Sequence, residues 1–529
     1  MNTNSLSSSI APYAPHGAYA NEPFVDFKAP AAEQDLRAAL DAVRSQLGQT
    51  YNLIIGGERL QTAGKISSVN PARPAQVVGV HQKAEAEHAE LAMRAALTAF
   101  AAWQYVDPAL RAGLLVRIAA IIRARKFEFM AWLTYEVGKN WAEADADVGE
   151  TIDFLEFYAR EAVRLAASTT PIQFPGERDE LLYIPLGVGA VIPPWNFPFA
   201  IMAGMTAAAI VTGNTVILKP SSDAPTIAAK FMEVLEEAGL PAGVVNFCPG
   251  SGSTFGNAIV EDARTRFISF TGSKAVGLQI HESAAKTRSG QIWIKRTVLE
   301  MGGKDSILVC ADADLDKAAD AVVASTYGFS GQKCSACSRA IVEAPAYDAF
   351  VAKLIERAEK LTVGDPVANH NLGPVVNQAA LSSMLNYIEI GKREGKLVLG
   401  GKAPEIEGGY YLEPTIFVDI EPHAVLAQEE IFGPVLAVIK CADLDDGLRI
   451  ANNTEYGLTG AIWSTDRAKL DRARREFHVG NLYLNRKCTG AMVGAHPFGG
   501  FNMSGTDSKA GGADYLLLFT QAKSVGEKL

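Results

Sequence analysis

The sequence predicts an α/β protein built from two successive series of alternating strands and helices. The chain has 529 residues, of which 48% are hydrophobic, so it is long enough for two or three domains and can bury large cores. From residue 183 to 285, short apolar runs alternate with stretches of helical periodicity, and a second such series runs from 306 to about 481. Alternation of this kind indicates parallel sheets with helices on both faces.

The region before the first series is predicted to be mostly helical. Residues 1–20 contain no Lys or Arg and lack the features of a secretory signal or a mitochondrial presequence, so we expect a flexible arm. A hairpin of strands 51–55 and 59–62 is expected around Gly56-Gly57, closed by residues 68–71. Helices are expected at 33–46, 84–103, 107–124, 126–138 and 139–164. Glu150, in the last of these, is expected to be a solvated charge.

Within the two series, each expected element follows from its apolar period and its bounding turns. In the first series the expected strands are 183–191, 214–219, 244–248 and 266–270, and the expected helices are 202–212, 224–238, 253–261 and 273–285. In the second, the expected strands are 306–309, 340–342, 396–399, 415–418 and 434–439, and the expected helices are 315–327, 347–359, 378–394 and 444–452.

Two apolar stretches need separate interpretation. No charged residue occurs from Leu181 to Asn214, but several prolines interrupt this run, so a buried strand, a loop and a buried helix are expected rather than a membrane span. The tail at 515–525 is apolar and strand-like. An exposed edge strand tends to pair with another chain, so at least a homodimer is expected.

Charge and cysteine content restrict the partners and the compartment. The formal net charge of -10 argues against nucleic acid or an anionic membrane surface as a partner. Six scattered cysteines suit a reducing compartment such as the cytoplasm. Cys334 and Cys337 form a C-x-x-C, which is compatible with a redox pair or half of a zinc site, but no second pair lies at zinc spacing, so no metal is expected.

Cys334 is the strongest candidate for a reactive group. It lies in Phe-Ser-Gly-Gln-Lys-Cys-Ser-Ala-Cys-Ser-Arg, residues 329–339, whose small side chains leave room for a substrate to reach the sulfur. The pattern indicates a helix that enters a turn, where Lys333 and backbone N–H groups are expected to favour the reactive thiolate. The alternative is a small buried apolar residue, as for most isolated cysteines.

The sequence neighbours of two polar residues, Asn196 and Glu300, suggest catalytic roles for them. Asn196 follows a buried strand, and its carboxamide can donate a hydrogen bond to an oxyanion, although a plain turn asparagine is the alternative. Glu300 precedes paired glycines, where a carboxylate can swing and activate a water molecule, although a surface charge is the alternative.

Glycine-rich turns occur where strands end and helices begin, at 250–253 and 270–273. Backbone N–H groups at such helix starts favour phosphate. The G-x-G-x-x-G fingerprint is not met, because Gly256 comes one residue late after Gly250 and Gly252. A third cluster of small residues around Gly490-Ala491 can expose backbone N–H groups as an anion-binding nest.

Several segments together resemble one family. Gly-Gln-x-Cys, with an aromatic residue five positions before the cysteine, resembles the nucleophile motif of the aldehyde dehydrogenase superfamily. The segments 194–198, 218–221, 270–273, 299–304 and 429–434 resemble its other motifs, in family order. The longer run 331–339, with Thr-Gly-Ala at 489–491 before Pro-Phe-Gly-Gly at 497–500, is similar to the glutamate γ-semialdehyde dehydrogenases. The resemblance extends from about Asn21 to the C-terminus.

The resemblance implies a fold, a reaction and a set of site residues. It implies a Rossmann-type cofactor domain, a second α/β catalytic domain and a small β oligomerisation arm. It implies NAD-dependent oxidation of glutamate γ-semialdehyde to glutamate, a step of proline breakdown, through a cysteine thioester. The implied catalytic residues are Cys334, Glu300 and Asn196. The implied cofactor-binding residues are Lys219, Ser222, Gly252, Phe270, Thr271, Gly272, Ser273, Glu430, Phe432 and Trp195. The implied substrate-binding residues are Ser335, Gly490, Ala491, Phe197 and Phe498.

One departure bears on the cofactor. Many relatives carry a Glu where this chain has Ser222, and that Glu holds the adenosine ribose hydroxyls. Its absence removes a carboxylate that would repel a 2′-phosphate, so NAD is expected to be preferred and NADP tolerated.

The expected organisation divides the chain as follows: an arm at 1–20, a cofactor domain at 21–169 and 190–298, a catalytic domain at 299–481, an anchor loop at 482–505, and oligomerisation segments at 170–189 and 506–529. Three alternatives to the function stay open: a cofactor-free hydrolase using Cys334 and Glu300, a non-catalytic protein of this fold, and a dehydrogenase for another small semialdehyde such as succinate semialdehyde.

Overall fold

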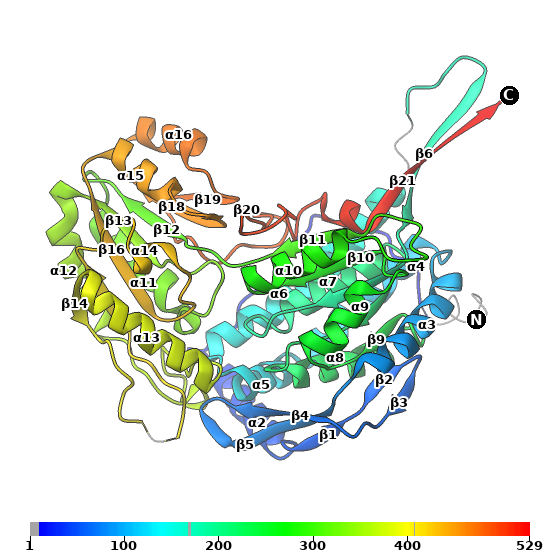
Figure 1. The fold of residues 1–529 in the computed structure, drawn as a ribbon, viewed down its shortest axis with the longest axis horizontal. Helices are drawn as coiled ribbons and strands as arrows, with labels where there is room; N and C mark the ends of the chain where they lie inside the picture. The colour runs from blue at the N-terminus through cyan, green and yellow to red at the C-terminus, as the bar shows by residue number, and fades with distance from the viewer. Residues whose placement is uncertain (1–9, 168–170, 407) are drawn as a thin grey trace.

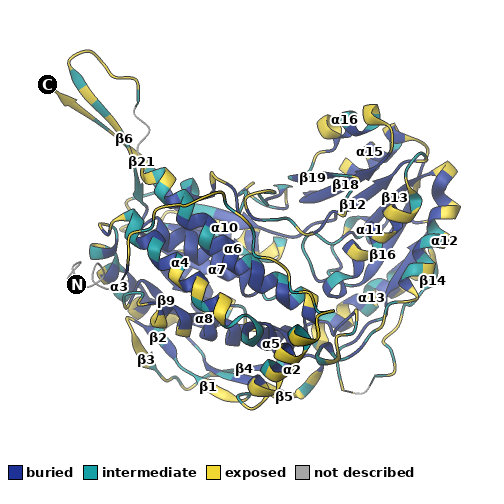
Figure 2. Cartoon of the chain, turned by 180° about the vertical axis from the view of Figure 1, so that it is seen from behind, coloured by how far each residue is buried: buried dark blue, intermediate teal, exposed yellow. Residues whose placement is uncertain are grey.

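The computed structural model describes residues 10–167, 171–406 and 408–529, and it confirms the predicted α/β class with two alternating series. Each series contributes most of the strands of a seven-stranded sheet. The two sheets lie in separate lobes, one on each side of the molecule in Figure 1. Buried residues concentrate on the strands and on the helix faces that cover them (Figure 2).

The first sheet has the strand order β11-β10-β7-β8-β9-β2-β3. Its strands are β2 (Leu53–Ile55), β3 (Glu58–Leu60), β7 (Val188–Ile192), β8 (Thr215–Leu218), β9 (Val245–Phe247), β10 (Phe267–Thr271) and β11 (Arg296–Glu300). The five strands from β7 to β11 run parallel, and β2 and β3 are antiparallel additions at one edge. Since β7 lies between β8 and β10, the winding direction reverses beside it, and a crevice opens at the carboxyl ends of these strands.

Helices cover both faces of the first sheet. They are α2 (Pro30–Arg44), α3 (Ala86–Trp103), α4 (Pro108–Ala124), α5 (Lys126–Val137), α6 (Trp141–Ala166), α7 (Ala200–Val211), α8 (Pro225–Glu237), α9 (Asn257–Glu261) after a π-turn at Gly252–Gly256, and α10 (Lys274–Ala285). The expected helices at 33–46, 84–103, 107–124 and 126–138 therefore agree with the structure to within a few residues.

The second sheet has the order β14-β15-β16-β13-β12-β18-β19 and is parallel apart from the edge strand β14. Its strands are β12 (Ser306–Val309), β13 (Arg339–Glu343), β14 (Lys396–Leu399), β15 (Thr415–Val418), β16 (Val435–Cys441), β18 (Thr459–Trp463) and β19 (Asn481–Leu484). The helices are α11 (Leu315–Tyr327), α12 (Tyr347–Ala358), α13 (Gln378–Glu394), α14 (Val425–Gln428), α15 (Leu444–Asn452) and α16 (Arg467–Glu476). Two apolar clusters, one on each face, form its core.

Three small sheets complete the fold. The strands β1 (Gln49–Tyr51), β5 (Arg73–Gln82) and β4 (Lys65–Asn70) form one, below the first sheet in Figure 1. The short strands β17 (Tyr456–Gly457) and β20 (Phe501–Asn502) form another. The third pairs β6 (Glu177–Pro185) with β21 (Thr520–Lys528), and it projects away from the body of the molecule (Figure 1).

Several local expectations are wrong. The single strand expected at 183–191 is two strands, β6 and β7, that belong to different sheets and are separated at Gly187, whose φ is 139°. The segment 68–71 does not close the first hairpin. It lies at the end of β4, where the chain turns and pairs antiparallel with β4 as the ten-residue strand β5, which was not expected. The boundary expected at residue 299 falls inside β11, so Glu300 still belongs to the first sheet.

The apolar tail also differs from the expectation. Residues Tyr515–Phe519 form a 3₁₀ turn whose Tyr515, Leu516 and Phe519 side chains are buried in the core of their own subunit. The strand β21 that follows pairs along its whole length with β6 of the same chain. The tail therefore does not need a neighbouring chain to bury its apolar residues, and the reason given for an oligomer was wrong.

The expectation of a flexible arm is wrong for its described part, residues 10–20. Ile10 is buried in the main core, and the Tyr13 N–H donates to the Ala109 carbonyl at 2.9 Å. Tyr19 packs edge-on against Phe157, with 5.2 Å between ring centroids. Residues 1–9 lie outside the described chain.

In the described part of the chain, no helix has the length and apolar character needed to cross a membrane. Over the same residues, no three His, Cys, Asp or Glu side chains are grouped so as to hold a metal ion.

Candidate active site

Two cavities meet at Cys334, between the two lobes. One, of about 600 Å³, lies over the carboxyl ends of β7, β8 and β10, and the other, of about 370 Å³, lies between α6 and the loop at 488–498. Cys334 lines both. A group attached to this sulfur can therefore react with molecules held in either cavity.

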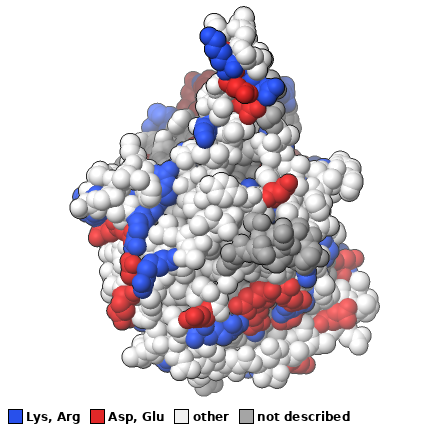
Figure 3. Space-filling view, turned by 90° about the vertical axis from the view of Figure 1, so that its right-hand side faces the viewer, with Lys and Arg blue, Asp and Glu red and all other residues white. Residues whose placement is uncertain are grey.

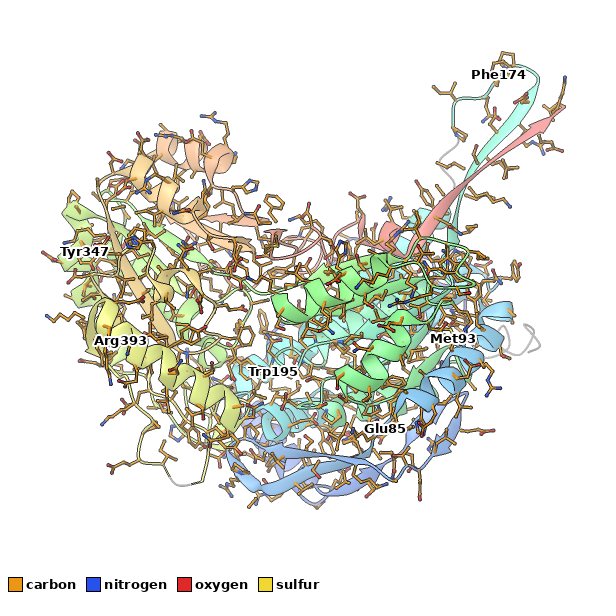
Figure 4. The ribbon with its side chains drawn as sticks, viewed as in Figure 1. Glu85, Met93, Phe174, Trp195, Tyr347 and Arg393 are labelled. Atoms are coloured by element: carbon orange, nitrogen blue, oxygen red, sulfur yellow. The ribbon has the colours of Figure 1, made fainter. Side chains whose placement is uncertain are left out.

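The larger cavity gathers every residue that was expected to bind the cofactor. It is lined by Trp195, Lys219, Ser222, Gly252, Phe270, Thr271, Gly272, Ser273, Glu430 and Phe432. Most of them follow strands of the first sheet, which the reversal of winding beside β7 brings to one edge. Glu430 and Phe432 come from the second lobe, just before β16. Trp195 lies between the lobes in Figure 4.

Two charged groups lie in this cavity. The Lys219 ammonium donates to the Pro220 carbonyl at 3.2 Å, and burial lowers its pKa to about 8. Glu430 accepts the Gly303 N–H at 3.0 Å, and burial raises its pKa to about 7. A Cβ atom at Gly302 would lie 2.1 Å from the Glu430 carboxylate, so only glycine fits beneath it. Trp195 packs edge-on against Phe432, with 5.5 Å between the rings.

The nucleophile loop connects α11 to β13 through a turn, as expected, and the backbone of this turn is unusual. Phe329, Ser330 and Gly331 have φ values of 50°, 55° and 70°, a left-handed conformation that is costly for the first two residues. The Ser330 hydroxyl donates to the Gly373 carbonyl at 2.8 Å, and the Gln332 amide oxygen accepts the Val376 N–H at 2.8 Å. A Cβ atom at Gly331 would lie 2.2 Å from the Gly433 carbonyl oxygen. These contacts position Cys334 against the second lobe.

Asn196 lies beside the same loop. Its amide nitrogen is buried and donates to the Gln332 carbonyl at 3.1 Å, two residues before Cys334. Asn196 lines the larger cavity together with Cys334. A small shift would direct its N–H toward an oxygen bonded to carbon at the sulfur, which is the geometry of an oxyanion hole.

The charges around Cys334 correct one expectation. Lys333 does not favour the thiolate, because its ammonium pairs with the Glu143 carboxylate at 2.6 Å. Burial, together with the carboxylates of Asp305, Glu430, Glu300 and Glu150, raises the pKa of the Cys334 thiol well above its usual range. The thiol is therefore protonated in this state, and a positive charge in the adjoining cavity would favour its ionisation.

Glu300 is held in a cage of backbone and hydroxyl donors at the end of β11. One carboxylate oxygen accepts the Ser508 hydroxyl at 2.6 Å and the Ser508 N–H at 3.3 Å, and the other accepts the Gly500 N–H at 3.4 Å. Burial outweighs these bonds and raises the pKa of Glu300 to about 7. A carboxylate with such a pKa can act as a general base near neutral pH.

The smaller cavity gathers every residue that was expected to bind the substrate. It is lined by Ser335, Gly490, Ala491, Phe197 and Phe498, together with Glu300. Gly490 has a φ of 74°, the left-handed conformation that turns the anchor loop. The anchor loop, residues 488–498, is joined to the following segment by reciprocal hydrogen bonds between Phe498 and Ala510, at 2.8 and 2.7 Å.

The aromatic wall of this cavity is supported by a buried ion pair. Lys139 lies 3.7 Å above the centre of the Phe197 ring and donates to the Asp147 carboxylate at 3.0 Å. Asp147 also accepts the Ala200 N–H at 2.7 Å, which fixes the start of α7 just after Phe197. Lys139 and the Asp147 side chain of α6 therefore hold the Phe197 ring in place on the side away from the cavity.

One residue of this site was not expected. Glu150 is not a solvated charge, because it lines the smaller cavity and burial raises its pKa to about 8. On α6 it lies among Glu143, Ala146, Gly149 and Asp153, which line the same cavity. Acidic side chains interspersed with small residues at helical spacing were the available signal.

Comparison with known proteins agrees with this architecture. Residues 59–525 match the aldehyde dehydrogenase family. The 1-pyrroline-5-carboxylate dehydrogenase of Geobacillus thermodenitrificans is 57% identical over 510 residues, which cover 96% of this chain and 99% of that protein. That of Bacillus cytotoxicus is 56% identical over 513 residues, 97% of this chain and 99% of that protein. A crystal structure of a Thermus 1-pyrroline-5-carboxylate dehydrogenase with bound NAD superposes with a TM-score of 0.96 at 50% identity, covering 98% of this chain and 100% of that one. The chain therefore belongs to the aldehyde dehydrogenase family.

Proposed function

We propose that the protein oxidises glutamate γ-semialdehyde, the open form of 1-pyrroline-5-carboxylate, to glutamate with NAD as the electron acceptor. The observation that carries this proposal is the position of Cys334, at the junction of a crevice above a doubly wound sheet and a second cavity lined by the loop that contains Gly490 and Ala491. The similarity to 1-pyrroline-5-carboxylate dehydrogenases over nearly the whole chain supports the choice of substrate and cofactor.

The residues suggest a covalent route. The Cys334 thiolate adds to the aldehyde carbon, and the Asn196 amide and the Cys334 backbone N–H stabilise the resulting oxyanion. Bound NAD accepts the hydride from that carbon, which leaves a thioester on the sulfur. Glu300 then takes a proton from a water molecule that attacks the thioester, so that the carboxylate product leaves and the thiol is restored.

The larger cavity fits a dinucleotide. Gly252 and Ser273 place helix starts, which favour phosphate, at its wall. Lys219 and Glu430 offer a donor and an acceptor for the two ribose rings, and Phe432 offers a flat apolar surface for the nicotinamide. We assign Trp195, Phe270, Thr271 and Gly272 to the walls of this cofactor site.

Cofactor selectivity is the first prediction. Ser222 is exposed and lines the cavity, but Asp223 beside it also lines the cavity. A single carboxylate near a 2′-phosphate costs about 1 kcal/mol in a wet site. We therefore expect NAD to be preferred about fivefold by kcat/KM, with NADP still turned over. Ser222→Glu should strengthen the preference and Asp223→Asn should weaken it; NADP turnover that is undetectable in the intact protein would contradict the argument.

The smaller cavity has features for both charged groups of an amino acid. Gly490, Ala491, Ser335, Phe197 and Phe498 line it. We assign the Gly490 and Ala491 N–H groups and the Ser335 hydroxyl to the α-carboxylate, and the two phenylalanine rings to the methylenes. Glu150 has no ion pair among the described residues. An α-ammonium group beside it would favour ionisation of its carboxyl group, which then offers a partner for that ammonium. Succinate semialdehyde lacks that group and is shorter, which favours glutamate semialdehyde over it.

The second prediction tests the substrate. With NAD, glutamate semialdehyde should give the highest kcat/KM in a panel that includes 5-oxopentanoate, succinate semialdehyde and propanal. Each charge-assisted bond to the carboxylate contributes about 1.5–3 kcal/mol, so propanal should be at least about a hundredfold poorer. A panel in which another aldehyde is best would end the assignment, although the dehydrogenase class would stand.

Two variants locate the recognition within the same panel. Ser335→Ala should lower kcat/KM about tenfold or more for every carboxylated aldehyde and leave propanal nearly unchanged. Glu150→Gln should lower it for glutamate semialdehyde alone, because 5-oxopentanoate has the same length and carboxylate but no ammonium group. Equal losses on all aldehydes would place both residues outside substrate recognition.

We also propose that the protein is a homo-oligomer. The two-stranded ribbon of β6 and β21 projects away from the body of the molecule (Figure 1). Such a ribbon is only marginally stable by itself in water. The segment that precedes β6 exposes Ile172 by 98% and Phe174 by 66%, and Phe174 lies at the outer end of the ribbon (Figure 4). The face below the ribbon of β6 and β21 shows few charged side chains at its centre (Figure 3), as protein interfaces often do. A second copy of this chain is the occupant we propose.

The third prediction concerns the oligomeric state and follows from the ribbon of β6 and β21. Light scattering should give a mass of at least twice 56.4 kDa for the intact protein. The double variant Ile172→Ser, Phe174→Ser removes the apolar contact without touching either cavity, so it should shift the protein toward monomers. Exposed Tyr105, on the body of the first lobe, gives the control Tyr105→Ser, which should stay oligomeric. A monomeric intact protein would contradict the proposal.

The remaining assignments are also proposals. We assign residues 21–169 and 188–300 to cofactor binding, 301–481 to the catalytic domain, 482–519 to the substrate anchor and its support, and 170–187 and 520–529 to subunit contact, because β7 belongs to the first sheet and Ser508 holds Glu300. All six cysteines are free, which supports a reducing cytoplasmic location. The hydrolase and non-catalytic alternatives would both give no aldehyde-dependent NADH.

A further inference from the structure

We infer that residues 19–24 form a strap that completes the substrate cavity, and that Asn21 is a positioning residue for the anchor loop. The inference rests on the proposed function, because it concerns the same carboxylate-binding loop. Glu22 and Phe24 line the smaller cavity together with the anchor loop and α6. The strap therefore forms part of the wall that surrounds a substrate.

Asn21 joins three separate parts of the chain. Its amide nitrogen donates to the Asp153 carboxylate on α6 at 2.8 Å and to the Val493 carbonyl of the anchor loop at 3.0 Å. Val493 is two residues from Ala491, whose N–H group we assign to the substrate carboxylate. The bridge thus fixes the position of the anchor loop relative to the helix that carries Glu150.

The strap is itself held firmly on both sides of Asn21. The Glu22 N–H donates to the other Asp153 oxygen at 2.6 Å, and the Glu22 carboxylate pairs with Arg123 at 2.8 Å and Lys126 at 3.6 Å. On the other side, Tyr19 packs on Phe157. A Cβ atom at Gly494 of the anchor loop would lie only 3.2 Å from the Tyr19 ring. Because the strap is tied to α4, α5 and α6, it gives the anchor loop a rigid support.

The position of the strap in the chain supports a role in specificity rather than in the common chemistry. The part of the chain that matches the aldehyde dehydrogenase family begins at residue 59, so the strap lies outside it. The strap contacts the wall of the smaller cavity and lines none of the larger one. Loss of Asn21 should therefore affect the binding of a carboxylated aldehyde but not cofactor binding or reaction of a simple aldehyde.

The test compares Asn21→Ala with the intact protein. For glutamate semialdehyde, kcat/KM should fall about tenfold, mainly through a higher KM, because two side-chain hydrogen bonds are lost and the Val493 carbonyl is left without its donor. The inhibition constant of glutamate as a product inhibitor should rise by a similar factor. The kcat/KM for propanal and the KM for NAD should stay within about twofold. A purely structural role would instead lower kcat/KM for both aldehydes and weaken NAD binding by similar factors.

Two further variants keep the test decisive. Asn21→Asp places a carboxylate against Asp153 and the Val493 carbonyl, so it should raise the KM for glutamate semialdehyde more than the alanine variant does. Lys28→Ala changes an exposed residue a few positions along the same segment and should behave like the intact protein. An unchanged KM in both Asn21 variants, or an equal loss with propanal, would overturn the inference. If the intact protein shows no preference for glutamate semialdehyde, the proposed function itself fails.

Discussion

Replacing Cys334 by alanine is expected to abolish aldehyde-dependent NADH formation, by about 10⁴-fold or more in kcat. Among the described residues Thr271 also lines both cavities, but its hydroxyl is a much weaker nucleophile than a thiolate, so the variant should not form the covalent adduct from which hydride leaves. The larger cavity loses only a sulfur atom at its edge, and NAD binding measured by fluorescence titration should survive. NADH absorbance with saturating aldehyde and NAD measures the loss.

A second cysteine provides the matched control. Cys337 lies three residues further on, is buried, and donates to the Arg339 carbonyl at 3.4 Å. Cys337→Ala should keep activity within a few-fold, because that thiol lines neither cavity. Normal turnover by Cys334→Ala, or a loss in Cys337→Ala as severe as in Cys334→Ala, would end the thioester scheme.

Replacing Glu300 by glutamine is expected to separate oxidation from hydrolysis. Hydride transfer needs no base at this position, so rapid mixing should show a burst of one NADH per active site. The following steady-state rate should be about 10²–10⁴-fold below that of the intact protein, because the thioester then waits for an unassisted water molecule. Glutamine has the same shape and can still accept the Ser508 hydroxyl, so the fold should be unaffected. A variant that turns over at the normal rate would show that Glu300 is not the base.

The pH dependence gives an independent check of the same residue. A general base acts when deprotonated, and the pKa of Glu300 is raised to about 7, so hydrolysis should increase as pH rises through about 7. That rise should vanish in Glu300→Gln. The Ser508 hydroxyl stabilises the charged carboxylate, so Ser508→Ala should raise the pKa and move the inflection to higher pH. An inflection that moves to lower pH would contradict the hydrogen bond as described.

The fold could be predicted to a large extent because its signals are local. Most parallel strands are short apolar runs between turns, and each helix has its own apolar period, so alternation alone indicated two α/β sheets with most of their strands. The strands β11, β18 and β19 were not expected. Boundaries were wrong where two strands follow without a strong break, as at β6 and β7, because periodicity does not show which sheet a strand joins. The catalytic and cofactor residues could be proposed from the sequence because each lies in a short motif beside a strand end.

The sequence by itself determined which chemical groups this protein has: a cysteine among small residues, an amide and a carboxylate at strand ends, and glycine-rich turns at helix starts. The tertiary structure alone decided the environment of each group, because burial and charge depend on residues distant in the chain. It paired Lys333 with Glu143, 190 positions away, so that Lys333 does not activate Cys334. It turned Glu150 into the smaller cavity, buried the apolar tail in its own subunit, and brought Asn21 to Val493 across 472 positions. No local pattern specifies such contacts, since they arise only when two lobes and a C-terminal loop pack around one cavity.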